Sequence, residues 1–323
     1  MNVLVAGGAG YIGAHTVKAL AEEGFEVCVL DNFSTGRRDF IRGHRIVPGD
    51  LMDKADVEAV FAGNTFGAVF HFASLIQVGE STRDPARYYV QNLVSSLNLI
   101  GAAVDFGVEH VIFSSSAAVY GVPHETPIAE NHPIAPANPY GRTKAVVENI
   151  LADYGRAYGL KSLSLRYFNA AGADPSGEMG ESHDPETHLI PNILLSVLGR
   201  VPRLEVFGTD FPTPDGTAVR DYIHVTDLAR AHVEGLKALM AGYPGGAVNL
   251  GTNRGYSVLE IIRKAESVTG SVIPYFAVPR RPGDVPVLLA SRDKAESELG
   301  WIPRHSDIEN ILETAWNWHR KNV

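Results

Sequence analysis

A short apolar segment near the start of the chain runs directly into three glycines spaced by three residues. The segment "NVLVA" (residues 2–6) precedes "GGAGYIG", which contains Gly7, Gly10 and Gly13, and a helical pattern begins at Tyr11. Glycine permits a tight turn, lets the backbone approach a diphosphate, and lets the helix pack closely on the strand. The diphosphate then meets the helix N-terminus. The order strand, glycines, helix therefore predicts a dinucleotide-binding βα unit.

A second apolar run, residues 26–31, ends in the carboxylate of Asp31. Its distance along the chain from the glycines is about that expected for a carboxylate that binds the adenosine ribose hydroxyls. The glycines alone are weak evidence, but together with this strand and carboxylate they predict a nicotinamide dinucleotide site. A carboxylate repels a ribose 2′-phosphate, so NAD is favoured over NADP, while Arg37 and Arg38 keep NADP open as an alternative.

Apolar runs and amphipathic stretches alternate through the first half of the chain. The runs expected as strands cover residues 2–6, 26–31, 45–47, 68–72, 110–114 and 162–168, and the helical patterns cover residues 11–23, 54–61, 85–106 and 139–158. Repeated βα units predict a parallel sheet with helices on both faces. We therefore predict an α/β protein with a doubly wound Rossmann domain, which binds NAD, over residues 1–170.

The composition and the pattern of apolar residues change after residue 170. A loop rich in glycine, proline and acidic residues covers 170–186, scattered short elements follow, and a helical pattern covers 308–320. We expect a smaller, mixed α/β C-terminal domain over residues 171–323 that binds the substrate, with a segment near 219–250 that returns to the first domain.

Composition limits the partners and the location of the protein. The 323 residues carry a net charge of −9 without a basic stripe, so neither nucleic acid nor an anionic membrane is expected as a partner. The only cysteine, Cys28, lies in an apolar run, which rules out an internal disulfide and indicates a reducing compartment. We find no signal peptide and no membrane-spanning run, expect a cytoplasmic protein, and expect no metal site.

The segment "NPYGRTKAVVE" predicts a helix entry that carries a possible base. Asn138 is a good N-cap, Pro139 suits the first turn, and Tyr140 and Lys144 then share one face of the helix. An ammonium group near a phenol favours the phenolate, which can act as a base. The pair alone is more typical of a half-buried aromatic side chain beside a lysine.

Three serines, Ser114, Ser115 and Ser116, follow the strand expected at 110–114. Ligands of parallel sheets bind at the carboxyl ends of strands, so Ser114 is expected to face the cofactor. A serine cluster alone is more typical of a turn. With Tyr140 and Lys144, however, Ser116 completes a set of phenol, cation and hydroxyl, which is what alcohol oxidation beside a nicotinamide requires. We therefore expect Tyr140, Lys144 and Ser116 to be catalytic.

Taken together, these motifs resemble the UDP-glucose 4-epimerases, also called UDP-galactose 4-epimerases, of the extended short-chain dehydrogenase/reductase superfamily. The resemblance covers nearly the whole chain, and the segments "PSGEMGE" and "DGTAVRDYIHV" of the second half are close to specific for these enzymes. It implies a homodimer with bound NAD and a UDP-sugar substrate. It also implies interconversion of UDP-glucose and UDP-galactose through a transient 4-keto sugar.

The resemblance assigns two sets of binding residues. Those for the cofactor are Gly7, Gly10, Tyr11, Ile12, Gly13, Asp31, Asn32, Asp50, Leu51, Phe72, Ala73, Asn92, Ser114, Tyr140, Lys144 and Phe168. Those for the sugar nucleotide are Ser116, Tyr140, Asn169, His188, Leu189, Phe207, Arg220, Tyr222, Arg281, Asp284 and Leu288. Two arginines can neutralise a diphosphate through charge-assisted hydrogen bonds, whereas without the resemblance they fit solvated ion pairs equally well.

Four positions bear on how closely the chain follows this family. Ile76, Ala118 and His188 stand where relatives have lysine, threonine and asparagine, and the first change is expected to weaken NAD retention. Leu288, within "RRPGDVPVLLAS", is expected to wall the sugar pocket.

Three other functions remain as alternatives at this point. An epimerase of UDP-xylose or UDP-glucuronate would share almost every residue named. A sugar-nucleotide 4,6-dehydratase is disfavoured, because that reaction needs an acidic pair after the active-site hydroxyl and this chain has Ala117 and Ala118. A non-catalytic NAD-binding sensor of the same fold could dispense with Tyr140, Lys144 and the arginines.

Overall fold

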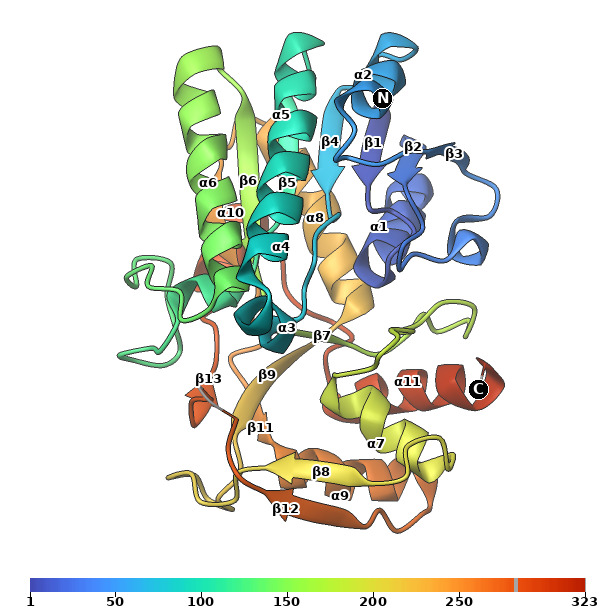
Figure 1. Cartoon of the computed structure of the whole chain (residues 1–323), viewed down its shortest axis with the longest axis vertical. Helices are drawn as coiled ribbons and strands as arrows, with labels where there is room; N and C mark the ends of the chain where they lie inside the picture. Colours follow the sequence, from blue (N-terminus) through green and yellow to red (C-terminus); the bar gives the residue numbers. More distant parts are fainter. Residues whose placement is uncertain (282–283, 323) are drawn as a thin grey trace.

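A seven-stranded parallel sheet forms the larger part of the molecule in the computed structural model, which describes residues 1–281 and 284–322 (Figure 1). The strands lie in the order β10-β6-β5-β4-β1-β2-β3. Their bounds are β1 Asn2–Ala6, β2 Glu26–Asp31, β3 Arg45–Pro48, β4 Ala68–His71, β5 His110–Ser114, β6 Lys161–Arg166 and β10 Gly246–Asn249. The strand order reverses between β1 and β4, and ligands of such sheets bind at this switch point.

Helices cover both faces of this sheet because side chains alternate along each strand. Val3 and Val5 of β1 belong to one core, with residues of α1, α8 and α10, and Leu4 and Ala6 belong to another, with residues of α2, α5 and α6. The bounds are α1 Tyr11–Glu22, α2 Lys54–Ala62, α5 Ser95–Asp105, α6 Pro139–Tyr158, α8 Val225–Met240 and α10 Asp293–Leu299. The predicted doubly wound α/β fold is confirmed.

The helix predicted over residues 85–106 is not a single α-helix. It consists of α4 (Pro85–Tyr89), a π-helical turn (Val90–Val94) and α5, and it follows a short helix, α3 (Val78–Arg83), that we did not predict. The side chain of Asn92, in the π turn, accepts a hydrogen bond from Leu75 N and donates to Leu75 O and Thr143 Oγ1. These tertiary contacts, which a propensity pattern does not contain, accompany the wider turn.

The strand predicted over residues 162–168 also ends early. Strand β6 stops at Arg166, and β7 (Asn169–Ala171) pairs with β9 (Val219–His224) in a different sheet. The chain therefore leaves the large sheet at its carboxyl edge, through Tyr167 and Phe168, and enters the smaller part of the molecule.

Within the described residues, two small sheets and three helices form that smaller part. Strands β11, β9 and β13 pair in this order with β7 also on β9, and β12 pairs with β8. A separate core packs between helices α7, α9 and α11. The bounds are α7 Leu189–Val197, β8 Leu204–Phe207, β9 Val219–His224, β11 Gly255–Ser257, α9 Val258–Thr269, β12 Tyr275–Val278, β13 Val287–Leu288 and α11 Ile308–Asn322.

The chain crosses between the two parts more than once. Within the range 219–250, β9 lies in the small sheet, whereas α8 packs on α1 and β10 lies in the large sheet. The division into an NAD-binding and a substrate-binding domain stays a prediction. Pro282 and Gly283 of "RRPGDVP", and Val323 at the end of the predicted second domain, lie outside the described residues.

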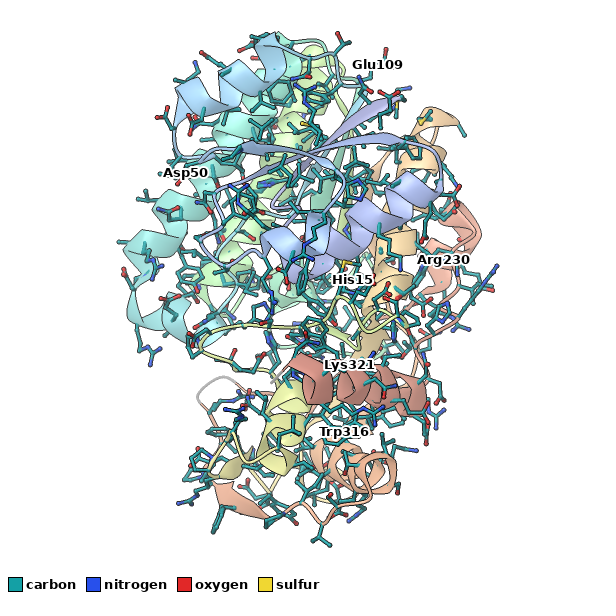
Figure 2. The ribbon with its side chains drawn as sticks, turned by 90° about the vertical axis from the view of Figure 1, so that its right-hand side faces the viewer. His15, Asp50, Glu109, Arg230, Trp316 and Lys321 are labelled. Carbon is teal, nitrogen blue, oxygen red and sulfur yellow. The ribbon has the colours of Figure 1, made fainter. Side chains whose placement is uncertain are left out.

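The C-terminal helix packs against the first part of the chain. Figure 2 shows α11, which carries Trp316 and Lys321, below α1, which carries His15. The ring of Trp318 meets the edge of Phe40 at a centroid distance of 5.5 Å. Among the described helices, none combines the length and the apolar character needed to cross a membrane.

Candidate active site

The glycine turn after β1 leaves the N-terminus of α1 open. Gly7 has φ +79°, and a Cβ on it would lie 2.5 Å from Ala73 N, while a Cβ on Gly13 would lie 2.2 Å from Gly7 O. Neither position has room for a side chain. Gly10 is the N-cap and gives the first turn no side-chain hydrogen bond. The backbone N–H groups at this helix end are therefore suited to a diphosphate, so the residues present fit a dinucleotide.

Tyr11 and Ile12 begin this helix, but only their backbone faces the predicted diphosphate site. The side chain of Tyr11 is buried, and its hydroxyl donates a 2.6 Å hydrogen bond to Gly172 O. The side chain of Ile12 packs on the core of the large sheet. The phenol of Tyr11 therefore joins the glycine turn to the loop after β7.

The carboxylate of Asp31 is held at the end of β2 by backbone donors. Its oxygens accept hydrogen bonds from Ala9 N at 2.9 Å and Phe33 N at 2.8 Å. Burial raises the pKa of Asp31, and these hydrogen bonds oppose that rise. Next to it, Asn32 Nδ2 donates to Asp50 Oδ2 at 3.1 Å, so these two predicted adenosine contacts lie together.

The two arginines that kept NADP open are already engaged. Arg37 pairs with Asp39 at 2.7 Å, and the guanidinium of Arg38 lies 4.1 Å from the centroid of the Phe33 ring. With the carboxylate of Asp31 in the ribose position, this arrangement favours NAD over NADP.

The segment after β4 forms the other wall of the switch point. Phe72 N and Ala73 N both donate to Ala6 O, which holds this segment beside the glycine turn. Leu51 is buried in the core behind it. The amide of Asn92, predicted to lie near the cofactor ribose, forms its hydrogen bonds with Leu75 and Thr143. In this structure it therefore fixes the position of the segment 72–75.

The three predicted catalytic residues meet at the carboxyl edge of the sheet. Ser116 follows β5 and caps a 3₁₀ turn by accepting from Ala118 N at 3.1 Å, while Tyr140 and Lys144 lie on the first turns of α6. Asn138 caps α6 by accepting from Gly141 N at 2.8 Å, as predicted. Burial raises the pKa of Tyr140, and the nearby hydroxyl of Ser116 opposes that rise.

Lys144 is buried beside the tyrosine and held by two oxygens. Its ammonium donates to Ser74 Oγ and to Ser114 O, both at 2.8 Å, and lies 5.8 Å from the centroid of the Tyr140 ring. Burial lowers the pKa of Lys144 to about 7, against the attraction of Glu148. We expected Lys144 to lower the pKa of Tyr140, but in the protein alone burial dominates and the pKa is raised. A low phenol pKa therefore requires a further positive charge, such as the nicotinamide ring.

A buried polar network that we did not predict supports this edge. Ser114 Oγ and Tyr167 OH share a 2.5 Å hydrogen bond, and Ser115 Oγ donates to Glu148, which also pairs with Arg166. Ser115 and Glu148 would have been hard to connect from the sequence, because the contact joins the residue after a strand to the third turn of a helix.

Strand pairing aligns the predicted substrate residues on one face of a small sheet. In the register, Asn169 stands opposite Tyr222, and Leu288 stands opposite Arg220. Paired residues of neighbouring strands share a face, as do residues two apart on one strand. Asn169, Tyr222, Arg220 and Leu288 therefore lie on one face. Leu288 and Phe168 both pack against the 3₁₀ turn that follows Ser116. Leu288 therefore lies between the predicted catalytic residues and the predicted substrate residues of the small sheet.

Both predicted diphosphate arginines lie around one carboxylate. Arg220 Nη2 lies 3.9 Å from Asp284 Oδ1, and Arg281 Nε lies 3.1 Å from Asp284 Oδ2. Arg281 also covers the ring of Phe207 at 4.9 Å, and Arg220 donates to Val285 O. The carboxylate of Asp284 keeps the two guanidinium groups from repelling each other, so both can face the same diphosphate.

His188 and Leu189 lie at the N-terminus of α7, within a cluster that the sequence reading missed. His188 is the N-cap, and Leu189 packs on the core of the smaller part. Nδ1 of His188 lies 2.8 Å from Glu181 and 3.0 Å from Glu186. Burial lowers the pKa of His188, but these carboxylates outweigh it and raise the pKa to about 10. The only available signal was the alternation of Glu and His in "GESHDPETH".

Comparison with known proteins gives consistent matches over the whole chain. Residues 3–251 match the family described as "NAD dependent epimerase/dehydratase family". A UDP-glucose 4-epimerase of Rhizobium leguminosarum bv. trifolii is 48% identical over 99% of this chain and 98% of its own length.

Two solved structures superpose closely on this fold. The UDP-glucose 4-epimerase of Brucella ovis in complex with NAD has a TM-score of 0.95 and 49% identity, covering 98% of this chain and 97% of that one. The UDP-glucose 4-epimerase of Bifidobacterium longum in complex with NAD+ and UDP has a TM-score of 0.95 and 41% identity, covering 100% of this chain and 99% of that one.

Proposed function

Because this chain belongs to the NAD dependent epimerase/dehydratase family, we propose that it is an isomerase that interconverts UDP-glucose and UDP-galactose with bound NAD. The observation that carries this proposal is the meeting of Ser116, Tyr140 and Lys144 at the carboxyl edge of the sheet, in a chain that matches UDP-glucose 4-epimerases over its whole length. NAD, when bound, accepts the hydride from C4 of the hexose and returns it.

The side chains of this protein transfer the proton of the 4-hydroxyl group. Tyr140, as phenolate, removes that proton while Ser116 hydrogen-bonds the same oxygen. A 4-keto sugar results, and Tyr140 gives the proton back when the opposite face of the sugar has been reduced. Lys144, fixed by Ser74 and Ser114, supplies a positive charge next to the phenol in its protonated form.

Inversion at C4 requires that the UDP part stays in place while the sugar presents its other face. Arg220 and Arg281 are the charged groups suited to the diphosphate, and Asp284 is suited to the ribose hydroxyls. On the sugar side, Leu288 and Phe168 offer apolar contact instead of charge. A wall of this kind holds neither face of the hexose by a specific hydrogen bond.

The relatives do not favour UDP-xylose or UDP-glucuronate as the principal substrate, since those at 44 to 48% identity bear the name UDP-glucose 4-epimerase. A non-catalytic sensor is also not favoured, because the phenol, hydroxyl and ammonium groups are all retained in one place. A cytoplasmic location fits the buried, unpaired Cys28 of β2.

The same proposal includes a homodimer formed through helices. Val90, Val94 and Leu97 are spaced by four and three residues and are 51%, 37% and 42% exposed, which gives an apolar stripe along the π turn and α5. Val146, 37% exposed, extends it onto the neighbouring helix α6. Light scattering coupled to size exclusion is expected to give twice the chain mass.

The activity is tested by incubating the purified protein with UDP-galactose, without added NAD, and separating the products. We expect UDP-glucose to form, and we expect NAD in the supernatant after the protein is denatured. Failure to form UDP-glucose, or consumption of one NAD for each sugar converted, would contradict an epimerase. The same assay with UDP-xylose and UDP-glucuronate compares their catalytic efficiencies directly.

A further inference from the structure

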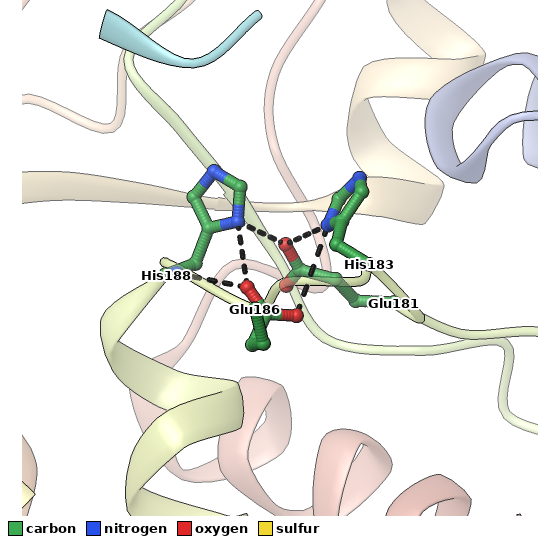
Figure 3. A group of neighbouring side chains, drawn as sticks. All are labelled: Glu181, His183, Glu186 and His188. Atoms are coloured by element: carbon green, nitrogen blue, oxygen red, sulfur yellow. Dashed lines mark hydrogen bonds and ion pairs between the residues drawn. The ribbon is translucent and has the colours of Figure 1, made fainter. Parts of the chain in front are cut away.

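Four side chains of the loop between β7 and α7 converge on one point. They are Glu181, His183, Glu186 and His188, and one ligand-type atom from each lies within 4.8 Å of all the others (Figure 3). Both histidines direct Nδ1 toward the two carboxylates. His188 Nδ1 lies 2.8 Å from Glu181 Oε1 and 3.0 Å from Glu186 Oε1, and His183 Nδ1 lies 3.2 Å and 3.8 Å from oxygens of the same two residues.

These separations are close to those of a tetrahedral metal site. Zinc bonds of about 2.0 to 2.2 Å to nitrogen and oxygen place neighbouring ligand atoms roughly 3.3 to 3.6 Å apart in a tetrahedron. The four observed distances lie on either side of that range. Only small movements of the side chains are needed to accept an ion at the centre.

Ion pairing alone does not satisfy one nitrogen of the cluster, Nδ1 of His183. Nδ1 of His183 is buried and has no hydrogen-bond partner by geometry, although both carboxylates are near it. The side chains of Glu181 and Glu186 are only 5% and 8% exposed. Burying two carboxylates is costly unless their charge is neutralised. Without a metal, these carboxylates raise the pKa of His183 to about 9 and that of His188 to about 10, so the two protonated histidines supply that charge. A divalent cation bound to two neutral imidazoles and two carboxylates gives a site with no net charge.

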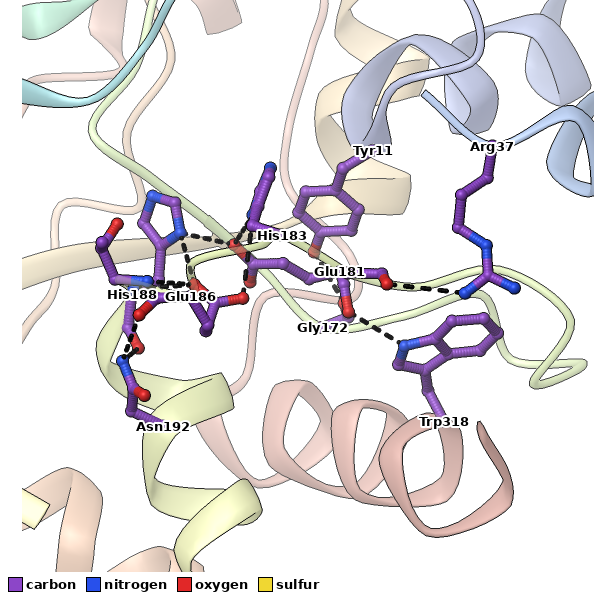
Figure 4. A network of polar contacts seen from close by, with 11 residues as sticks. Tyr11, Arg37, Gly172, Glu181, His183, Glu186, His188, Asn192 and Trp318 are labelled. Carbon is purple, nitrogen blue, oxygen red and sulfur yellow. Dashed lines mark hydrogen bonds and ion pairs between the residues drawn. The ribbon is translucent and has the colours of Figure 1, made fainter. Parts of the chain in front are cut away.

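Further hydrogen bonds, some of them to groups outside the cluster, hold the backbone around it (Figure 4). Trp318 Nε1 donates to Glu181 O at 3.0 Å, and Glu186 Oε1 accepts from the backbone N–H groups of Thr187 and His188 at 2.7 and 2.8 Å. Asn192 Nδ2 donates to His188 O at 2.9 Å. Such outer contacts orient metal ligands in advance of binding. The side chain of His188 is 42% exposed, which leaves a way in for an ion.

We propose that Glu181, His183, Glu186 and His188 form a binding site for a divalent transition metal ion, with zinc as the best match. The mixed nitrogen and oxygen donors suit zinc, whereas magnesium and calcium prefer oxygen donors throughout. The site is structural. It fixes the loop that leads into Leu189 and α7, next to Tyr11 at the start of α1, whose ring meets that of His183 edge-on at 6.4 Å.

The test uses untagged full-length protein that has been stripped with a chelator and dialysed. Titration with zinc chloride, followed by metal analysis of the desalted protein, is expected to give one zinc per chain. Zinc at about 100 times its dissociation constant is expected to raise Tm by about 5 °C, whereas magnesium chloride leaves Tm unchanged.

Two variants and one matched control locate the ion. His183→Asn and Glu186→Gln each remove one ligand and are expected to weaken zinc binding by about 100-fold or more, since outer-shell changes alone cost 10- to 100-fold. His44→Asn alters a partly exposed histidine outside the cluster and is expected to bind zinc like the unaltered chain. The circular dichroism spectra of the metal-free His183→Asn and Glu186→Gln variants are each compared with that of the metal-free unaltered chain. If one variant does not fold, the zinc affinity of the other variant tests the proposal.

The proposal is overturned if the unaltered chain retains no zinc, in which case the four residues form an ion-pair cluster only. It is equally overturned if His183→Asn and Glu186→Gln, both folded, bind zinc as tightly as the unaltered chain, because the ion then lies elsewhere. Neither readout depends on epimerase activity, so failure of this proposal leaves the proposed reaction untouched.

Discussion

The reacting end of the site and its nucleotide-binding end are assembled in different ways. Tyr140 and Lys144 come from one helix, and Ser116 caps the 3₁₀ turn that follows β5 and packs against this helix. The residues proposed to bind the nucleotide come from β7, α7, β8, β9 and the approach to β13, which are short elements far apart in the sequence. The first end therefore concentrates the chemistry in a few fixed atoms, whereas the second spreads binding over many contacts. Substitutions at the two ends are expected to differ in kind as well as in size.

The largest effect is expected for Tyr140→Phe. The variant loses only the phenolic oxygen, so kcat is expected to fall 100- to 10,000-fold, as is typical for a lost acid/base group, with NAD content and fold retained. Tyr158→Phe is the matched control, because Tyr158 is 64% exposed at the other end of the same helix. Conversion of UDP-galactose by both variants checks the expectation. A Tyr140→Phe enzyme with most of its activity would remove the proposed base.

Arg220→Ala is expected to give the opposite kinetic pattern. Hydrogen bonds to charged groups contribute about 1.5 to 3 kcal/mol, so KM for UDP-galactose is expected to rise about 10- to 100-fold with a smaller change in kcat. The control is Arg280→Ala, since Arg280 pairs with the exposed Asp210 and is expected to leave KM unchanged. A fall in kcat with unchanged KM would contradict the expectation that Arg220 contributes to binding and Tyr140 to the chemical step.

Lys144→Ala tests whether the two parts of the reacting end act together. Burial lowers the pKa of Lys144 to about 7, so the ammonium is mostly present below neutral pH and can favour the phenolate there. Without it, the phenolate forms at higher pH, and the rising limb of the pH profile of kcat moves upward. Each unit of movement costs about tenfold in rate at pH values below the limb. An unchanged profile would exclude Lys144 from the control of Tyr140.

The same contrast explains what the sequence could predict. The glycines, Asp31 and the pair Tyr140 and Lys144 are read from spacing within one βα unit or one helix, where the geometry follows from the period of the element. The large sheet was predicted in the same way, from apolar runs that repeat along the chain. The prediction of the sheet is confirmed because its constraints are local, while the roles of the glycines, Asp31, Tyr140 and Lys144 stay predictions.

Features that depend on contacts between distant segments were not predicted. The π turn accompanies hydrogen bonds from Asn92 to Leu75 and Thr143, and the face shared by Asn169 and Arg220 depends on the pairing of β7 and β13 with β9. The pKa of Tyr140 was expected to fall, because the sequence shows a nearby lysine but not the degree of burial. The substrate residues were assigned from the resemblance to a family, since no local pattern contains them.

Leu288 is where the two ends of the site meet, and the smallest effect is expected there. It stands opposite Arg220 in the small sheet and packs with Phe168 near the turn after Ser116. This packing is consistent with a wall of the sugar pocket, where leucine offers no hydrogen-bond partner to a 2-acetamido group. Leaving that amide unpaired costs roughly 1 to 3 kcal/mol. We therefore expect UDP-galactose to be preferred over UDP-N-acetylgalactosamine by about 10- to 100-fold in kcat/KM.

Two substitutions at this position separate a wall from a simple core residue. Leu288→Ser makes room and adds a hydroxyl, so the preference is expected to narrow severalfold, whereas Leu288→Tyr fills the space and is expected to widen it. Leu289→Ser is the matched control, because Leu289 follows β13 and its side chain lies against Gly255. The ratio of kcat/KM for the two sugars cancels any general loss of activity. If both Leu288 variants leave this ratio unchanged, Leu288 packs away from the sugar and the width of the pocket is set by other residues.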